Sequence, residues 1–83
     1  GGLKAGDDVL VSGVKVGHVE KVDLVPDNYL ARVYINLDTH IKLPTDTAAL
    51  ISSESLLGGR YLALEPGADE DMIAPGGRIE YTL

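Results

Sequence analysis

Ala31-Arg32-Val33-Tyr34-Ile35-Asn36-Leu37 is the most regular segment of this 83-residue chain. Its aliphatic side chains alternate one for one with polar or aromatic ones, which is the period of a β-strand that buries one face. The alternation therefore predicts a strand that places Val33 and Ile35 in the core. The opposite face, which carries Tyr34, is expected to be wet or to lie at an interface.

Further short strands are expected on both sides of this segment. Ten Gly and four Pro punctuate the chain, and the stretches between them are rich in Val, Ile, Leu, Thr and Tyr, a composition typical of strands separated by turns. No stretch indicates a long helix. Gly17 interrupts the pattern between residues 14–16 and 18–24, and an isolated glycine in such a stretch indicates a bulge or a bend. The additional strands are expected at 8–11, 14–16, 18–24, 47–52, 61–65 and 78–83.

About six or seven short strands in so short a chain predict an all-β fold of one domain, residues 1–83. A compact barrel is favoured over an open sheet because closure removes exposed strand edges. No apolar run approaches the roughly 20 residues of a membrane-spanning helix. The formal net charge of −6 is the wrong sign for a module that neutralises phosphates, so no nucleic-acid partner is expected.

The residues that could carry chemistry are few. The two histidines, His18 and His40, lie on unrelated segments, and the chain has no Cys, so a zinc site is not expected. Ser52, Ser53 and Ser55 lie outside any nucleophile elbow. The acidic residues at 7–8 and 69–71 lack the spacing of a calcium loop. We therefore predict no catalytic residue, no metal site and no cofactor.

The connection Ser55-Leu56-Leu57-Gly58-Gly59 departs from the composition expected of a turn. Two large aliphatic side chains stand side by side where polar residues are usual. Neighbours on an extended chain point opposite ways, so Leu56 and Leu57 cannot both enter one small core without a bulge. The pair either folds back to plug the end of a barrel or makes an apolar contact with a partner protein, another copy or a lipid chain.

When this loop is considered together with the segments around it, nearly the whole chain resembles the MCE domain family. The resemblance is carried, in order, by Gly2-Leu3, by residues 9–13, by Val14-Lys15-Val16-Gly17-His18-Val19, by the segment 44–50, by Ser55-Leu56-Leu57-Gly58 with Tyr61-Leu62-Ala63-Leu64, and by residues 76–79. The Leu-Leu-Gly sequence followed by Tyr-Leu-Ala-Leu is its strongest part.

The resemblance implies a small seven-stranded β-barrel whose first strand is missing from this chain, along with the N-terminal membrane anchor and the C-terminal helical tail. It also implies a noncatalytic subunit of a phospholipid transport system of Gram-negative bacteria. That subunit would form a homohexamer in the periplasm, anchored to the inner membrane, with an ABC permease, an ATPase and a periplasmic lipid carrier as partners. Its pore loop would contact lipid through Leu56 and Leu57, flanked by Ser55 and Gly58.

A second reading comes from the residues alone. In that reading the chain is a structural or protein-interaction β-barrel whose apolar loop, at Leu56 and Leu57, docks a partner protein.

Overall fold

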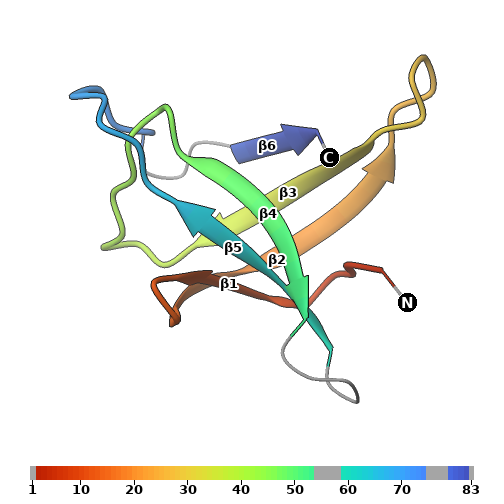
Figure 1. Ribbon diagram of the computed structural model, residues 1–83, viewed down its shortest axis with the longest axis horizontal. Coiled ribbons are helices and arrows are strands. Elements are labelled where there is room, and N and C mark those ends of the chain that lie inside the picture. The colour runs from red at the N-terminus through yellow and green to blue at the C-terminus, as the bar shows by residue number, and fades with distance from the viewer. Residues whose placement is uncertain (1, 54–58, 75–78, 83) are drawn as a thin grey trace.

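Six strands form the part of the chain that the computed structural model describes, residues 2–53, 59–74 and 79–82 (Figure 1). The all-β prediction is confirmed, and no helix that could cross a membrane is found within these ranges. The segments expected at 14–16 and 18–24 form one continuous strand. The strands are β1 (Asp8–Val11), β2 (Val14–Leu24), β3 (Ala31–Leu37), β4 (Ala48–Ser53), β5 (Arg60–Glu65) and β6 (Ile79–Thr82).

The six strands make one sheet in the order β4-β5-β1-β2-β3-β6. Neighbouring strands are antiparallel except β1 and β5, which run parallel with Val9 opposite Leu62. The sheet curls, so that β4 and β5 pass across β2 and β3 in Figure 1. This curled half-barrel agrees with the predicted fold class, and β4 and β6 are its edges among the described strands.

Two bulges on β2 produce much of this curl. Opposite β1 the register passes from Val9–Gly17 to Leu10–Lys15, which leaves Val16 as an extra residue. Opposite β3 it passes from Val19–Ile35 to Lys21–Tyr34, which leaves Glu20 extra. Each extra residue bends the strand and increases its twist. The bulge or bend predicted at Gly17 is confirmed.

The core lies on the concave side of the curl and is almost entirely aliphatic. Val33 and Ile35 are buried in it, as the alternation of β3 predicts. The other buried members of this cluster are Val9, Val16, Val19, Leu43, Leu62 and Leu64. Four side chains are completely buried, and they come from β1, β2, β3 and β5, so one core holds these four strands together.

Tyr34 is the exception on β3, because it is buried although it lies on the opposite face. The prediction of a wet face is wrong at this position. The bulge at Glu20 brings Lys21 opposite Tyr34, and the Lys21 ammonium lies 4.5 Å from the centre of the Tyr34 ring. A cation over an aromatic ring is attracted by the negative face of the ring, so the two side chains stabilise each other.

Replacing Ile35 with Ala should lower the free energy of unfolding by about 2–5 kcal/mol, because it leaves a cavity in this core. Asn36→Ala, at the exposed neighbouring position, should change it by no more than about 0.5 kcal/mol. Denaturant unfolding of the two variants measures both values. Equal midpoints would contradict the assignment of the two faces of β3.

Gly17→Ala tests the close approach of β2 and β3. A Cβ atom at position 17 would overlap the backbone carbonyl oxygen of Asn36, which has no rotamer to move aside, whereas a Cβ at Gly2 would meet open space. We expect Gly17→Ala to destabilise the fold by about 1–3 kcal/mol and Gly2→Ala to have little effect. Thermal unfolding of both variants decides the point, and indistinguishable melting temperatures would show that the strands can separate freely here.

Candidate functional site

The apolar connection singled out in the sequence joins the edge strand β4 to β5. Leu56 and Leu57, with Ser55 and Gly58, lie outside the described residues. The strands that carry them are described, and the last pair of their antiparallel ladder is Ser53 opposite Arg60. In Figure 1 this end of the β4–β5 hairpin lies at the lower side, away from the β2–β3 hairpin and from the connection that follows β5. The leucine pair therefore follows directly on a regular ladder at one end of the sheet.

Apolar surface extends along β4 toward this connection. Leu50 is 43% exposed and Ile51 is 37% exposed, and consecutive residues of a strand point to opposite faces. Ile51 lies opposite Leu62, which is fully buried, while Leu50 lies opposite Ala63 on the outer face. The edge strand thus presents aliphatic side chains on both faces close to the leucine pair.

A lysine lies at the foot of the same connection. The Lys4 ammonium is 4.0 Å from the point that a Cβ of Gly59 would occupy. It is held there by Asp7, whose carboxylate accepts hydrogen bonds from Lys4 Nζ at 2.6 Å and from the Lys4 backbone N–H at 2.8 Å. Asp7 is itself fixed to β2, because its backbone carbonyl accepts a hydrogen bond from the Val19 N–H. The chain before β1 is thereby fastened beside the start of β5.

The Asp7 carboxyl is the one buried acidic side chain among the described residues. Burial alone raises its pKa, but the hydrogen bonds and the positive charge of Lys4 outweigh this effect, so the pKa lies below its usual range. Sequence reasoning treated residues 7–8 only as an acidic pair. The spacing of Lys4 and Asp7 across Gly6, which has a positive φ of 91°, is the signal that points to a turn closed by an ion pair.

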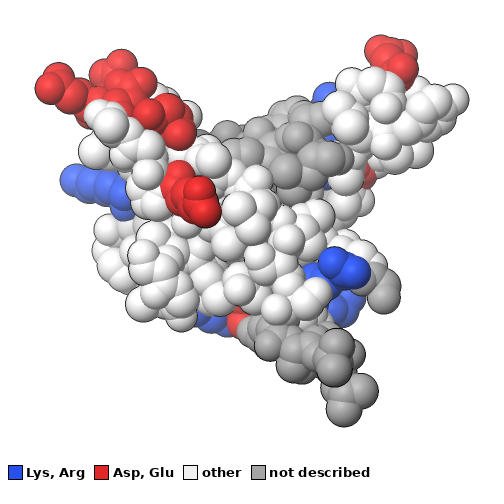
Figure 2. Space-filling model, in the orientation of Figure 1, with Lys and Arg blue, Asp and Glu red and all other residues white. Residues whose placement is uncertain are grey.

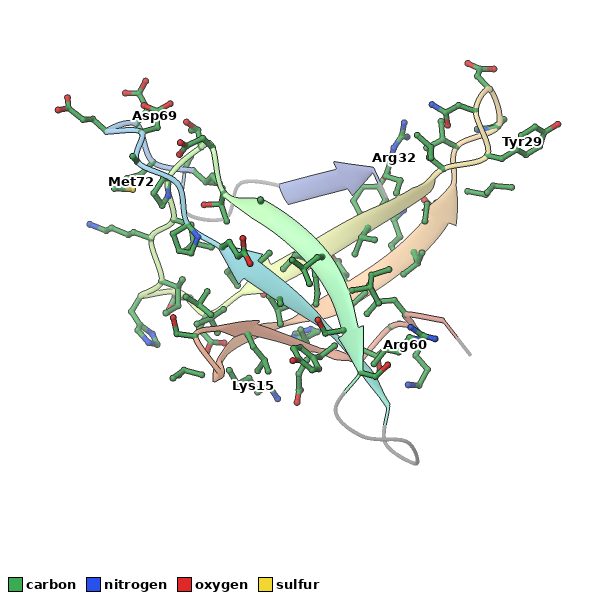
Figure 3. The ribbon with its side chains drawn as sticks, viewed as in Figure 1. Lys15, Tyr29, Arg32, Arg60, Asp69 and Met72 are labelled. Carbon is green, nitrogen blue, oxygen red and sulfur yellow. The ribbon has the colours of Figure 1, made fainter. Side chains whose placement is uncertain are left out.

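Charge is unevenly distributed on the visible face of the molecule. In Figure 2 the acidic side chains gather mainly at the upper corners, and the labelled Asp69 and Tyr29 in Figure 3 mark the two loops concerned. Arg60, labelled in Figure 3, lies at the lower side, near the end of β4. On this face, the end of the hairpin that leads to Leu56 and Leu57 is therefore separated from most of the acidic side chains.

The acidic loop after β5 uses its carboxylates to hold its own backbone. Asp46 accepts hydrogen bonds from the Ala68 and Asp69 N–H groups at 2.9 and 3.1 Å, and its carboxylate fills the space that a side chain at Gly67 would need. Asp69 accepts the Asp71 N–H and the Thr45 hydroxyl, and these bonds lower its pKa. These oxygens order the loop.

Neither of the two histidines meets a catalytic partner in the described structure. His18 is exposed on β2 and His40 is exposed between β3 and β4. Within residues 2–53, 59–74 and 79–82, no three His, Asp or Glu side chains are grouped so as to hold a metal ion. The site that stands out is therefore the apolar end of the β4–β5 hairpin.

Comparison with known proteins identifies the family. A family model described as MlaD protein matches residues 1–67, which include β1 to β5 and the leucine pair. The chain belongs to the MlaD family. The resemblance to the MCE domain drawn from the sequence is thus confirmed.

Three curated relatives show how far the likeness extends. The intermembrane phospholipid transport system binding protein MlaD of Escherichia coli K12 is 41% identical over 71 residues, 84% of this chain and 39% of the relative. The protein of the same name from Haemophilus influenzae is 31% identical over 86 residues, 99% of this chain and 52% of the relative. Lipoprotein LprN of Mycobacterium tuberculosis is 35% identical over 80 residues, 93% of this chain and 20% of the relative. The chain thus spans about half or less of each relative.

Asp7→Asn should destabilise the chain at pH 7, because Asn cannot accept both Lys4 bonds as an ion. Since the folded-state pKa of Asp7 is lowered, its stabilising effect is present above the unfolded pKa of about 3.9 and is lost as pH falls through the folded value. The difference between wild type and Asp7→Asn should therefore shrink between pH 5 and pH 3. Urea unfolding at several pH values measures it, with Asp27→Asn in an exposed turn as the control. A difference that stayed constant down to pH 3 would contradict the role given to Lys4.

Proposed function

We propose that this chain is a noncatalytic, lipid-binding subunit of a system that transports phospholipid between the inner and outer membranes. The observation that carries the proposal is the match to the MlaD family across the β4–β5 connection, where the sequence places Leu56 and Leu57. Named relatives in this family are phospholipid transport binding proteins. The described residues support a binding role because aliphatic side chains of β4, Leu50 and Ile51, are exposed on the strand that leads into this connection.

In the proposed mechanism six copies form a ring, and the leucine pair of each copy lines its central pore. An acyl chain that leaves a bilayer loses about 0.8 kcal/mol for every methylene exposed to water. A continuous apolar lining removes most of that penalty along the path. No single subunit needs a closed pocket, because the neighbouring loops together surround the chain. Hydrophobic contact with the lining is nondirectional, so the same pore suits lipids whose tails differ in length.

The rest of the transport system supplies what this domain lacks. We assign the energy of transport to an ABC permease and its ATPase in the inner membrane, and delivery across the periplasm to a soluble lipid carrier. The subunit itself is anchored to the inner membrane with its ring in the periplasm. Its acidic surface keeps it soluble there, and the leucine pair meets only the tails.

Replacing both pore leucines, Leu56→Asn with Leu57→Asn, should abolish phospholipid transport and leave the fold intact. Polar amides in the lining leave unpaired groups beside the acyl chain, which is unfavourable. Leu56→Met with Leu57→Met keeps the lining apolar and should preserve transport, so it is the matched control. Restoration of the outer-membrane barrier in a strain that lacks the protein measures transport, and denaturant unfolding measures the fold.

The outcomes of this experiment separate the possible roles of the loop. An Asn variant that unfolds would identify the leucines as a core plug, with a loss of about 2–5 kcal/mol for each buried side chain. An Asn variant that restores the barrier would remove the leucines from the mechanism. Lipid extracted from the purified ring supports the proposal, and a ring free of lipid that binds one protein tightly supports the interaction module instead.

A further inference from the structure

The tip of the β2–β3 hairpin, residues 24–30, exposes large apolar side chains. Tyr29 is 79% exposed, Leu24 is 62% exposed and Leu30 is 40% exposed. The hairpin projects from the body of the sheet at the upper right of Figure 1, and Figure 3 shows the labelled Tyr29 side chain pointing away from it. None of the three side chains belongs to the core cluster of the described residues or packs against it. Their apolar surface therefore contributes nothing to that core.

The backbone at Tyr29 is strained. Its φ of 58° is the left-handed conformation, which suits Gly or Asn and is rare for a bulky side chain. The turn holds this conformation in place, because the Tyr29 N–H donates to the Val25 carbonyl at 2.9 Å and the Val25 N–H donates to the Leu30 carbonyl at 2.8 Å. An aromatic residue at a position where Gly or Asn would fold with less strain points to contact with another molecule.

The apolar side chains lie on both faces of the hairpin. Leu24, the last residue of β2, is opposite Ala31, and the next pair toward the tip joins Val25 to Leu30. Successive pairs of an antiparallel ladder direct their side chains to opposite faces. A hairpin that rests on the surface of one protein needs a single apolar face. A tip that is apolar on both faces is covered only by surroundings that enclose it, and lipid molecules adapt to such a shape.

The charges near the tip determine which lipid surface fits and how deeply the tip enters it. Asp27 is exposed at the turn, and Figure 2 shows acidic atoms at the end of this projection. A carboxylate is expensive in hydrocarbon, so the tip fits the headgroup layer, where tyrosine is enriched. There the Asp27 carboxylate meets the ammonium group of a choline or ethanolamine headgroup. An anionic surface does not fit, because the chain has a formal net charge of −6.

We propose that the hairpin tip docks in the headgroup layer of a zwitterionic phospholipid bilayer, with the Tyr29 ring among the headgroups and Asp27 facing their ammonium groups. This contact goes beyond the proposed function, because it needs neither a ring nor a pore. In Figure 1 the tip and the end of the β4–β5 hairpin lie on different sides of the molecule. The bilayer contact and the leucine pair can therefore be tested with separate variants.

A tryptophan introduced at the tip reports the contact. This chain contains no Trp, so the complete protein with Tyr29→Trp is reconstituted with phosphatidylcholine vesicles whose acyl chains carry bromine, and the fluorescence of the unsubstituted protein is subtracted. Bromine quenches an indole only at close approach. We expect the Tyr29→Trp fluorescence to be quenched, and more strongly by bromine near the headgroup than by bromine near the end of the tail. Asn36→Trp, at an exposed position of β3, should not be quenched.

Leu24 and Val14 provide a matched pair of variants. They stand at the two ends of β2 and are 62% and 64% exposed, so removing either one changes the exposed apolar surface similarly. Combined with Tyr29→Trp, Leu24→Asn should lower the ratio of docked to free hairpins about tenfold, the effect of losing one apolar contact with the lipid. Val14→Asn should leave this ratio unchanged. An equal loss in both variants would mean general hydrophobic adsorption and would overturn the proposal.

Tyr29→Asn tests whether the tyrosine serves the fold instead. Asn tolerates the left-handed backbone better than Tyr does, so this variant should melt at the same temperature as the unsubstituted protein or at a higher one. Thermal unfolding measures the difference. A clearly lower melting temperature would show that Tyr29 is kept for stability, which contradicts its role in docking.

The lipid composition of the vesicles gives a second test. Replacing part of the phosphatidylcholine with phosphatidylglycerol should lower the quenching of Tyr29→Trp, and high salt should restore it by screening the repulsion. Quenching that increases with phosphatidylglycerol would mean that basic side chains hold the protein to the surface, and would overturn the proposal. A photoreactive group at position 29 that captures a protein and no lipid would also overturn it.

The failure of this inference is distinguishable from the failure of the proposed function. Quenching of Tyr29→Trp together with normal transport by the Leu56→Asn, Leu57→Asn variant would leave the bilayer contact standing and reject the pore. An unquenched Tyr29→Trp together with loss of transport in the double variant would reject the bilayer contact alone.

Discussion

The short strand β1 is the element on which the rest of the structure depends. Only four residues long, it is hydrogen-bonded on one side to β2 and on the other to β5. It therefore joins two units that are otherwise separate hairpins, β4 with β5 and β2 with β3. Val9 is fully buried between Leu62 and the bulged part of β2. Because a parallel pair cannot be closed by a tight turn, this contact brings together segments about 50 residues apart in the sequence.

The position of the β4–β5 hairpin follows from this joint. The ladder of β4 and β5 runs to Ser53 and Arg60, and β5 is fixed to the core only through β1 and its buried leucines. Just before β1, Asp7 holds the Lys4 ammonium, which lies 4.0 Å from the point that a Cβ of Gly59 would occupy, at the start of β5.

Much of the fold could be predicted from the sequence. The features that were missed have physical reasons that can be named. The alternation of residues 31–37 predicted the burial of Val33 and Ile35 correctly, because the aliphatic side chains at these alternate positions of β3 are the ones that face the core. Tyr34 was misplaced because its burial depends on the Glu20 bulge, and a bulge leaves no periodic trace. The parallel pairing of β1 with β5 is long-range and has no local signal. The composition of residues 55–59 pointed to the loop that is proposed to contact lipid, whereas the pairing of Leu10 with Ala63 arises only when two distant strands meet.

The net charge limits how copies of this chain can associate. Each copy carries a formal charge of −6, so copies repel one another over about a Debye length, roughly 8 Å at physiological salt. A broad polar interface would bring many of these like charges together, and a small apolar insertion avoids that cost. A narrow hydrophobic contact between neighbours, repeated around a ring, gains strength from closure because no copy can leave without breaking two contacts. The acidic surface that keeps single copies apart therefore favours small apolar contacts between copies over broad polar ones.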